Sequence, residues 1–354
     1  MKKLFPLVFL LLSLNLLHAQ NGTEPIKVTD LLRVKTLGTL SLNKDGSKAL
    51  FTVLSTEPDG ESKLEFKNST QIWIANTDGS TEPKQLTGKD NASQAVFSPD
   101  GKQIAFVRAV EGRSQIFLLP LDGGEAIQLT RFKYGANSPR WSPDGKKILF
   151  SASIPLKDLL KDTTLNPGKE VPRWPMEKPG LDNKQFLNNN AKADPDGNME
   201  EVRSYLTTNE NDRKAKVLTK LNFLDETDVN PDMSFNHFFM LEIKAEAKPV
   251  PVTKGFYRFN YAEFTPDGKQ LVLGGDIDST EHPDRSLEGQ IYLVNTDGSN
   301  LRKLLGEPGK NYNSPRISPS GKWLAFQYSN TSFVSIATLA IMPLNGGTPV
   351  DIPF

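Results

Sequence analysis

The stretch RWSPDGKKILF at residues 140–150 contains the pattern that decides the fold. An apolar residue, Trp141, precedes a Ser-Pro-Asp-Gly turn, and Ile148 and Phe150 occupy alternate positions of the segment that follows. Proline presets φ at the first turn position, aspartate bonds the backbone ahead of it, and glycine accepts the left-handed conformation that closes a short loop. The stretch therefore predicts a β-hairpin.

The same phrase returns along the chain. Its copies are SLNKDGSKALF at 41, VFSPDGKQIAF at 96, RWSPDGKKILF at 140, EFTPDGKQLVL at 263 and RISPSGKWLAF at 316. We assign a structural role to the turn residues of these copies, which are Asp45, Gly46, Asp100, Gly101, Asp144, Gly145, Asp267, Gly268 and Gly321. One Asp-Gly pair per hairpin lacks the ligand density of a calcium site, so we predict no metal there.

Each hairpin is followed by two further strand patterns, such as QIFLLPLDGG at 115 and AIQLT at 126. The copies start 55, 44, 123 and 53 residues apart, and three of these intervals suit a four-stranded blade. The sequence thus predicts an all-β fold, a β-propeller of about five WD-like blades. No evident strand closes the last blade onto the first, and an open array would leave two sheet faces in water.

The interval of 123 residues indicates an insertion at about 153–236, inside the third blade. Its segment EVPRWPMEKPG at 170 places Arg173 and Trp174 between prolines. A tryptophan beside an arginine is a common recognition contact, so these two residues are our candidate binding residues. The alternative, that Trp174 holds the loop against the propeller, stays open.

The first nineteen residues are typical of an export signal, with Lys2 and Lys3 before an apolar run and Ala19 at a small-residue cleavage site. We expect a mature propeller over residues 20–354 that is periplasmic or secreted and has no transmembrane anchor. The chain has no cysteine, so disulfides cannot contribute. Without the two signal lysines, 40 basic residues face 42 acidic ones, which does not favour nucleic-acid binding.

The sequence offers no recognisable catalytic set. No serine lies in a Gly-x-Ser-x-Gly elbow, and the mature histidines are His237, which we interpret as structural, and His282 in a loop. We find no clustered zinc ligands and no phosphate-binding glycine loop. We therefore predict no catalytic residue, no metal and no cofactor in this chain, and leave its status as an enzyme open.

The phrase WSPDGKKILFS, with its partner QIFLLPLDGGEAIQLT, resembles the propeller repeats of secreted bacterial serine peptidases of the prolyl oligopeptidase family, particularly the acylaminoacyl-peptidase and dipeptidyl-peptidase branch. It is also similar to the propeller of the periplasmic Tol-system protein. Two features favour the peptidases: the repeats begin directly after the signal, and the third unit carries an insertion ending in KVLTKLNFLDE and HFFMLEI.

The resemblance implies a seven- or eight-bladed propeller that limits access of peptides to an α/β-hydrolase domain. This sequence lacks that domain and two or three blades, so we expect a truncated chain that is inert by itself. The alternative is a free-standing Tol-like propeller that binds or scaffolds partner proteins. A third possibility is a propeller that binds glycans or small molecules, or a lyase built on one, but the absence of clustered His, Arg and acidic residues in the sequence disfavours it.

Overall fold

The computed structural model describes residues 27–59, 65–173, 190–208, 233–244, 246–277, 286–332 and 334–353. These residues form five four-stranded antiparallel sheets, each with its strands in chain order. Blade 1 contains β1 (Thr36–Leu42), β2 (Lys48–Pro58), β3 (Phe66–Asn76) and β4 (Lys84–Gln85). Blade 2 contains β5 (Ala92–Phe97), β6 (Gln103–Val110), β7 (Arg113–Pro120) and β8 (Ile127–Gln128).

The remaining three sheets repeat this arrangement. Blade 3 contains β9 (Asn137–Trp141), β10 (Lys147–Pro155), β11 (Ser234–Glu242) and β12 (Val250–Pro251). Blade 4 contains β13 (Arg258–Phe264), β14 (Gln270–Asp276), β15 (Gln290–Asn295) and β16 (Arg302–Leu305). Blade 5 contains β17 (Lys310–Ile317), β18 (Trp323–Asn330), β19 (Thr338–Pro343) and β20 (Val350–Asp351).

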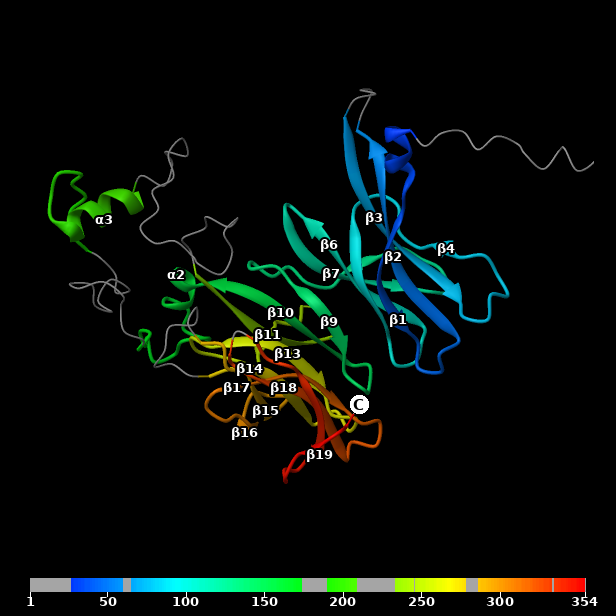
Figure 1. Ribbon diagram of the computed structural model, residues 1–354. Helices are drawn as coiled ribbons and strands as arrows, with labels where there is room; N and C mark the ends of the chain where they lie inside the picture. The colour runs from blue at the N-terminus through cyan, green and yellow to red at the C-terminus, as the bar shows by residue number, and fades with distance from the viewer. Residues whose placement is uncertain are drawn as a thin grey trace, which may run out of the picture.

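The first strand of each sheet lies nearest the axis of the array. β1 contacts β5, β5 contacts β9, and β13 contacts β17, whereas the fourth strands pair with the third strands of their own sheets (Figure 1). Sheets that meet face to face and turn about a common axis through their first strands are propeller blades. The chain is a β-propeller.

The blades stack through four hydrophobic clusters. These clusters join blades 1 and 2, 2 and 3, 3 and 4, and 4 and 5. Between blades 3 and 4, for example, Leu149 and Met240 of one sheet pack against Phe264 and Leu271 of the next. Among the described residues no hydrophobic cluster joins blade 5 to blade 1.

The turns of the repeat phrase also link the blades. Asp144 Oδ1 accepts hydrogen bonds from Ser142 Oγ at 2.6 Å and from the Lys146 backbone N–H at 3.1 Å, which together hold the pKa of this carboxyl below its usual range. Gly145 has φ +71° and lies against Pro99, the proline of the preceding blade's turn. Gly268 and Gly321 face the preceding prolines in the same way.

The structure places the other turn residues in equivalent positions. The turn glycines have φ between +68° and +74°, and Asp45, Asp100 and Asp267 accept backbone hydrogen bonds two residues ahead. In the fifth copy Ser320 stands where the others have aspartate, and its hydroxyl lies 3.4 Å from the backbone nitrogen of Lys322.

The long insertion lies between β10 and β11. These strands stay paired from Lys147 with Glu242 to Pro155 with Ser234, so the sheet extends slightly into the segment that we assigned to the insertion. Its described parts contain α2 (Leu156–Leu159) and α3 (Met199–Thr208), and a 3₁₀ turn, η2 (Val28–Arg33), precedes β1. No helix in the described part of the chain is long and apolar enough to cross a membrane.

We predict that Gly145→Ala lowers the free energy of unfolding by about 1–2 kcal/mol, because an L-residue with a side chain pays that cost in the left-handed region. A Cβ at this position would lie 3.7 Å from Pro99, which is ordinary contact, so the backbone conformation alone is tested. Urea denaturation is the measurement. Gly145→Asn should lower the free energy of unfolding by less, because asparagine tolerates the left-handed region better. Gly88→Ala, at a glycine outside the left-handed region, should leave the free energy of unfolding nearly unchanged. An equal loss in Gly88→Ala would contradict this explanation.

Candidate axial binding site

Four polar side chains from three successive blades meet near the axis. Arg140 comes from β9, Tyr261 and Glu263 from β13, and Arg316 from β17. Arg140, Glu263 and Arg316 occupy the same position of the repeat phrase, directly before its apolar residue. Because the repeat places this position on every innermost strand, charges at that position in adjacent blades converge.

Tyr261 is the centre of this axial cluster. The guanidinium carbon of Arg140 lies 5.0 Å from the centroid of the Tyr261 ring, and that of Arg316 lies 5.1 Å from it. Arg316 Nη1 donates a hydrogen bond to the Tyr261 hydroxyl, which in turn donates to Glu263 Oε2 at 2.7 Å. Both arginines are thus held by cation–π attraction, and one of them by a hydrogen bond as well.

The axial cluster carries an excess of positive charge. Two guanidinium groups face one carboxylate, and that carboxylate bonds Tyr261 rather than an arginine. Among the residues that the structure describes, neither Arg140 nor Arg316 forms an ion pair. Arginine that is positioned but unpaired at a partly exposed surface can bind a carboxylate with two parallel hydrogen bonds.

The Tyr261 hydroxyl stays protonated throughout the physiological range. Burial, followed by its hydrogen bond to Glu263, raises the pKa of Tyr261 to about 12, although the two arginines oppose the increase. The tyrosine therefore adds no negative charge that would cancel the arginines. The cluster as a whole offers a net charge of one positive unit to a ligand on the axis.

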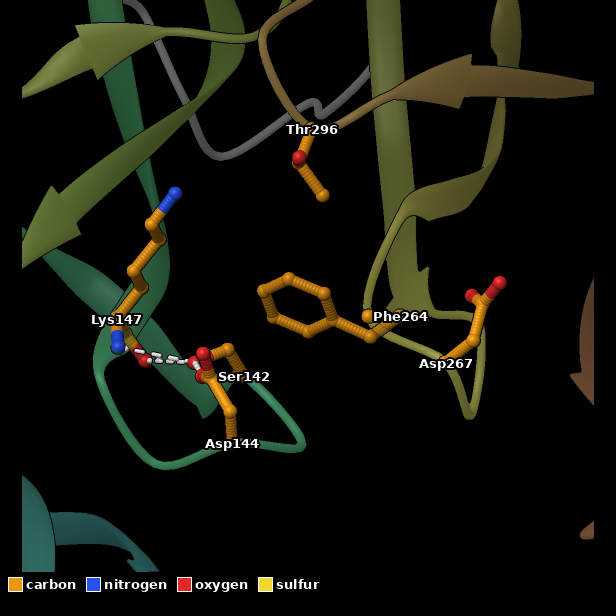
Figure 2. A pocket seen from close by; sticks show the side chains of 7 residues that line it. Ser142, Asp144, Lys147, Phe264, Asp267 and Thr296 are labelled. Atoms are coloured by element: carbon orange, nitrogen blue, oxygen red, sulfur yellow. Dashed lines mark hydrogen bonds between the residues drawn. The ribbon is translucent and has the colours of Figure 1, made fainter.

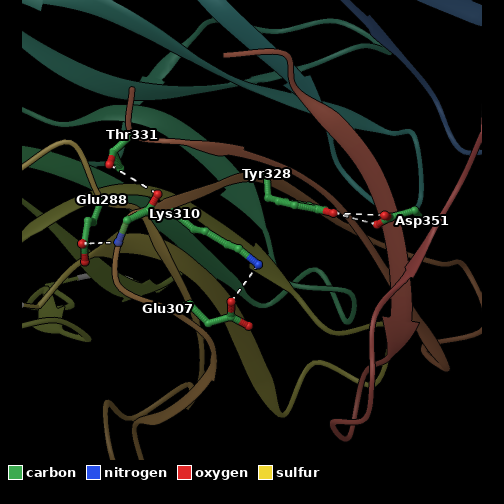
Figure 3. A network of polar contacts seen from close by, with 7 residues as sticks. Glu288, Glu307, Lys310, Tyr328, Thr331 and Asp351 are labelled. Carbon is green, nitrogen blue, oxygen red and sulfur yellow. Dashed lines mark hydrogen bonds and ion pairs between the residues drawn. The ribbon is translucent and has the colours of Figure 1, made fainter. Parts of the chain in front are cut away.

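A second group of polar contacts, around blade 5, differs in this respect. Lys310 Nζ lies 2.7 Å from Glu307 Oε2, and within blade 5 the Tyr328 hydroxyl donates to both carboxylate oxygens of Asp351 at 3.0 and 3.1 Å (Figure 3). The backbone N–H of Gly309 donates to Glu288 at 2.7 Å. Since these charges have partners, we interpret these contacts as structural. They join the loops before β15 and β17, and they hold β20 to β18.

Two cavities accompany the blade junctions. One, of about 90 Å³, lies between the repeat turns of blades 3 and 4, where Asp144 and Asp267 flank Phe264 (Figure 2). It has room only for a few water molecules. The other is a cleft of about 480 Å³ between the β6–β7 turn and the start of the insertion, lined among others by Arg113, Lys133 and Asp158, and its size suits a small ligand or a peptide side chain.

His237 has a structural position, in agreement with its interpretation from the sequence. It is fully buried, and its Nδ1 lies 3.2 Å from Thr253 Oγ1, which accepts a hydrogen bond from the Phe238 backbone. In blades 1 and 2 the same place is taken by Gln71 and Gln115, whose side-chain oxygens accept bonds at 2.7 Å from Thr87 and Thr130. His237 is therefore the blade-3 version of a repeated contact between the third and fourth strands.

The proposed recognition pair is only partly described. Arg173 is exposed and makes no hydrogen bond or ring contact with the axial residues, while Trp174 and His282 lie outside the described residues. The contact proposed for Arg173 and Trp174 stays a prediction. In the described part of the chain no group of three His, Asp or Glu side chains could hold a metal ion.

The axial cluster could not be recognised from the sequence. The expectation of no clustered arginine and acidic residues is wrong, because Arg140 is separated in sequence from Tyr261, and Tyr261 from Arg316. The structure corrects this point by bringing them together. One feature of the sequence could have indicated the cluster. In the last three copies of the phrase a charged residue directly precedes the apolar residue, whereas the first two copies have Ser41 and Val96 there.

Comparison with known proteins supports the fold. No family model and no curated protein matches the chain. Among solved structures, it is similar to the acylaminoacyl peptidase of Pyrococcus horikoshii (TM-score 0.50, 16% identity, 92% of this chain and 40% of that one) and to the oligogalacturonate lyase of Vibrio parahaemolyticus (TM-score 0.51, 14% identity, 88% and 63%). A putative TolB from Agrobacterium tumefaciens has a TM-score of 0.49 at 17% identity, over 90% of this chain and 80% of that one. At these identities the likeness to the peptidase and the lyase shows the propeller fold alone.

We predict that His237 makes the fold sensitive to mild acid. Burial lowers the pKa of its imidazole from 6.5 to about 4, so the unfolded chain binds a proton that the folded chain rejects. Above pH 6.5 this histidine does not lower the free energy of unfolding. As the pH falls towards 4, protonation of His237 in the unfolded chain lowers the free energy of unfolding by up to about 3 kcal/mol. His237→Gln, which copies blades 1 and 2, should retain stability at pH 7 and lose less of it at pH 4. Equal pH dependence of the two proteins in urea denaturation would contradict this.

Proposed function

We propose that this chain is a polypeptide-binding propeller whose axial cluster engages the bound segment. The observation that supports the proposal is that the guanidinium groups of Arg140 and Arg316 both lie over the ring of the partly buried Tyr261 and form no ion pair among the described residues. A site of this kind is pre-organised, because the repeat and the cation–π contacts fix the arginines before a ligand arrives. A carboxylate of the ligand would supply the missing counter-charge.

The ligand class is inferred from chemistry and resemblance together. Carboxylates occur on acidic side chains and C-termini of polypeptides, and also on oligouronates. The repeat phrase and the insertion resemble those of peptidase propellers that admit peptides, which favours polypeptide. Oligouronate binding is therefore the competing outcome of the test.

We further propose that this propeller gates substrate access in a secreted serine peptidase, as the sequence resemblance suggests. The chain spans 40% of the Pyrococcus horikoshii acylaminoacyl peptidase. In such an arrangement the axial arginines would hold an incoming peptide while a separate catalytic domain cleaves it. The export signal would place the protein in the periplasm or outside the cell.

We predict that the tetrapeptide Ala-Ala-Ala-Glu binds the chain in isothermal titration calorimetry and that Arg140→Gln with Arg316→Gln weakens binding by at least about tenfold, the amount expected for losing charged hydrogen bonds. Affinity should also fall as salt is added. Arg131→Gln, at an exposed arginine outside the axial cluster, is the control and should bind like wild type.

The ligand comparison decides the class. Amidated Ala-Ala-Ala-Ala, which has no carboxylate, should bind much more weakly than Ala-Ala-Ala-Glu. Binding of trigalacturonate in preference to both peptides, or an unchanged affinity in the double variant, would contradict the proposed polypeptide site.

The peptidase proposal has its own test. Native protein from the periplasmic fraction of its source should react with a fluorophosphonate probe, which labels active serine hydrolases, and should be larger than 354 residues on an immunoblot. A native protein that no fluorophosphonate labels would contradict the gating role and leave the Tol-like alternative, a propeller that binds partner proteins without catalysis.

A further inference from the structure

The cleft of about 480 Å³ between blade 2 and the start of the insertion is polar and carries charges of both signs. Arg113 comes from blade 2, Asp158 from the insertion, and Lys133 from the loop between β8 and β9. The other polar side chains that line the cleft are those of Ser114, Tyr134, Asn137 and Ser153. None of these residues belongs to the axial cluster, so the cleft is a separate feature of the molecule.

The backbone fixes Arg113 at one side of the cleft. This residue begins β7 and pairs with Val110 across a two-residue turn formed by Glu111 and Gly112. The turn residues have φ of +50° and +76°, and positive φ at both positions closes the tightest kind of hairpin. The Arg113 side chain is exposed and forms no ion pair or hydrogen bond within the part of the chain that the structure describes. Its guanidinium is therefore available to a carboxylate.

Asp158 supplies the opposite charge from the insertion. It lies on α2, which follows β10 directly and is anchored to the blade, because Leu159 is fully buried and the Leu156 backbone N–H donates to the Met233 carbonyl at 2.8 Å. Asp158 is half-buried, and its carboxylate forms no ion pair or hydrogen bond with any other described residue. A cation that enters the cleft would supply its counter-charge.

Lys133, the third charged residue of the cleft, already has partners. Its Nζ lies 4.4 Å from the centroid of the Tyr134 ring and 4.0 Å from Asp162 Oδ2, so Asp162 offsets its charge. Arg113 and Asp158 are left as one cation and one anion without counter-ions. The cleft also offers side chains that make no hydrogen bond with the described residues, namely those of Ser114, Asn137 and Ser153.

We propose that this cleft binds a short peptide with free termini, a zwitterion of the size of a dipeptide. The carboxylate of the peptide binds Arg113, its ammonium group binds Asp158, and the free hydroxyl and amide side chains bind its peptide group. Hydrogen bonds between charged groups are the stronger ones, so affinity depends on both ends of the ligand. The volume of the cleft lies in the range of small-molecule sites. This inference does not depend on the axial site.

A ligand-observed NMR titration with the dipeptide Ala-Ala tests the proposal. Every protein in the experiment carries Arg140→Gln with Arg316→Gln, so that a carboxylate bound at the axial cluster cannot contribute and the two sites are tested separately. In this parent protein Ala-Ala should bind. N-acetyl-Ala-Ala, which has no ammonium group, and Ala-Ala amide, which has no carboxylate, should each bind at least about tenfold more weakly, the amount expected for losing a charged hydrogen bond.

Two further variants assign each end of the dipeptide. Arg113→Gln should weaken Ala-Ala binding at least about tenfold and leave the affinity for Ala-Ala amide unchanged, because the amide lacks the group that Arg113 binds. Asp158→Asn should weaken Ala-Ala binding by a similar factor and leave the affinity for N-acetyl-Ala-Ala unchanged. Lys161→Gln and Asp122→Asn remove exposed charges outside the cleft and serve as controls that should bind like the parent.

Circular dichroism of each variant verifies that it is folded. A parent protein that does not bind Ala-Ala, or that binds all three ligands equally, would overturn the proposal whatever the variants do. An unchanged affinity for Ala-Ala in folded Arg113→Gln or Asp158→Asn would overturn it as well.

Discussion

The structure depends on the packing of each sheet against the next. A four-stranded blade has two apolar faces, and a single blade cannot remove both from water. The apolar residue before each turn, such as Trp141 or Phe264, packs into the cluster shared with the preceding blade, while the second and third strands receive the blade that follows. Stability is therefore a property of junctions, of which the described residues form four.

The axial cluster follows from the same repetition. Because the first strand of every blade lies nearest the axis, a given position of the phrase recurs at one level around it. Three blades carry Arg140, Glu263 and Arg316 there, and the ring of Tyr261 of blade 4 contacts both arginines. Turn chemistry and blade packing thus fix the site, and only the side chains at one repeated position determine its charge.

Much of the architecture could be predicted from the sequence, for local reasons. The turn residues and the alternating strands act over about ten residues, so the five hairpins and the four-stranded blades are visible without a structure. The role of His237 was also accessible, because it stands where blades 1 and 2 have glutamine. The contacts of Arg140 with Tyr261, and of Tyr261 with Arg316, were not, because spacing along the chain gives no distance between blades. For the same reason the contacts of Arg173 could not be inferred from its neighbours in the sequence.

The central claim is that each blade is stabilised by its neighbours. Its most direct test is native-state hydrogen exchange followed by mass spectrometry. In dilute protein, amides of β2, β3, β18 and β19 should exchange through openings of lower free energy than those of β6, β7, β10, β11, β14 and β15, because the end blades have one junction each. Equal protection of all five blades, at the free energy of global unfolding, would contradict the claim that the junctions hold the fold together.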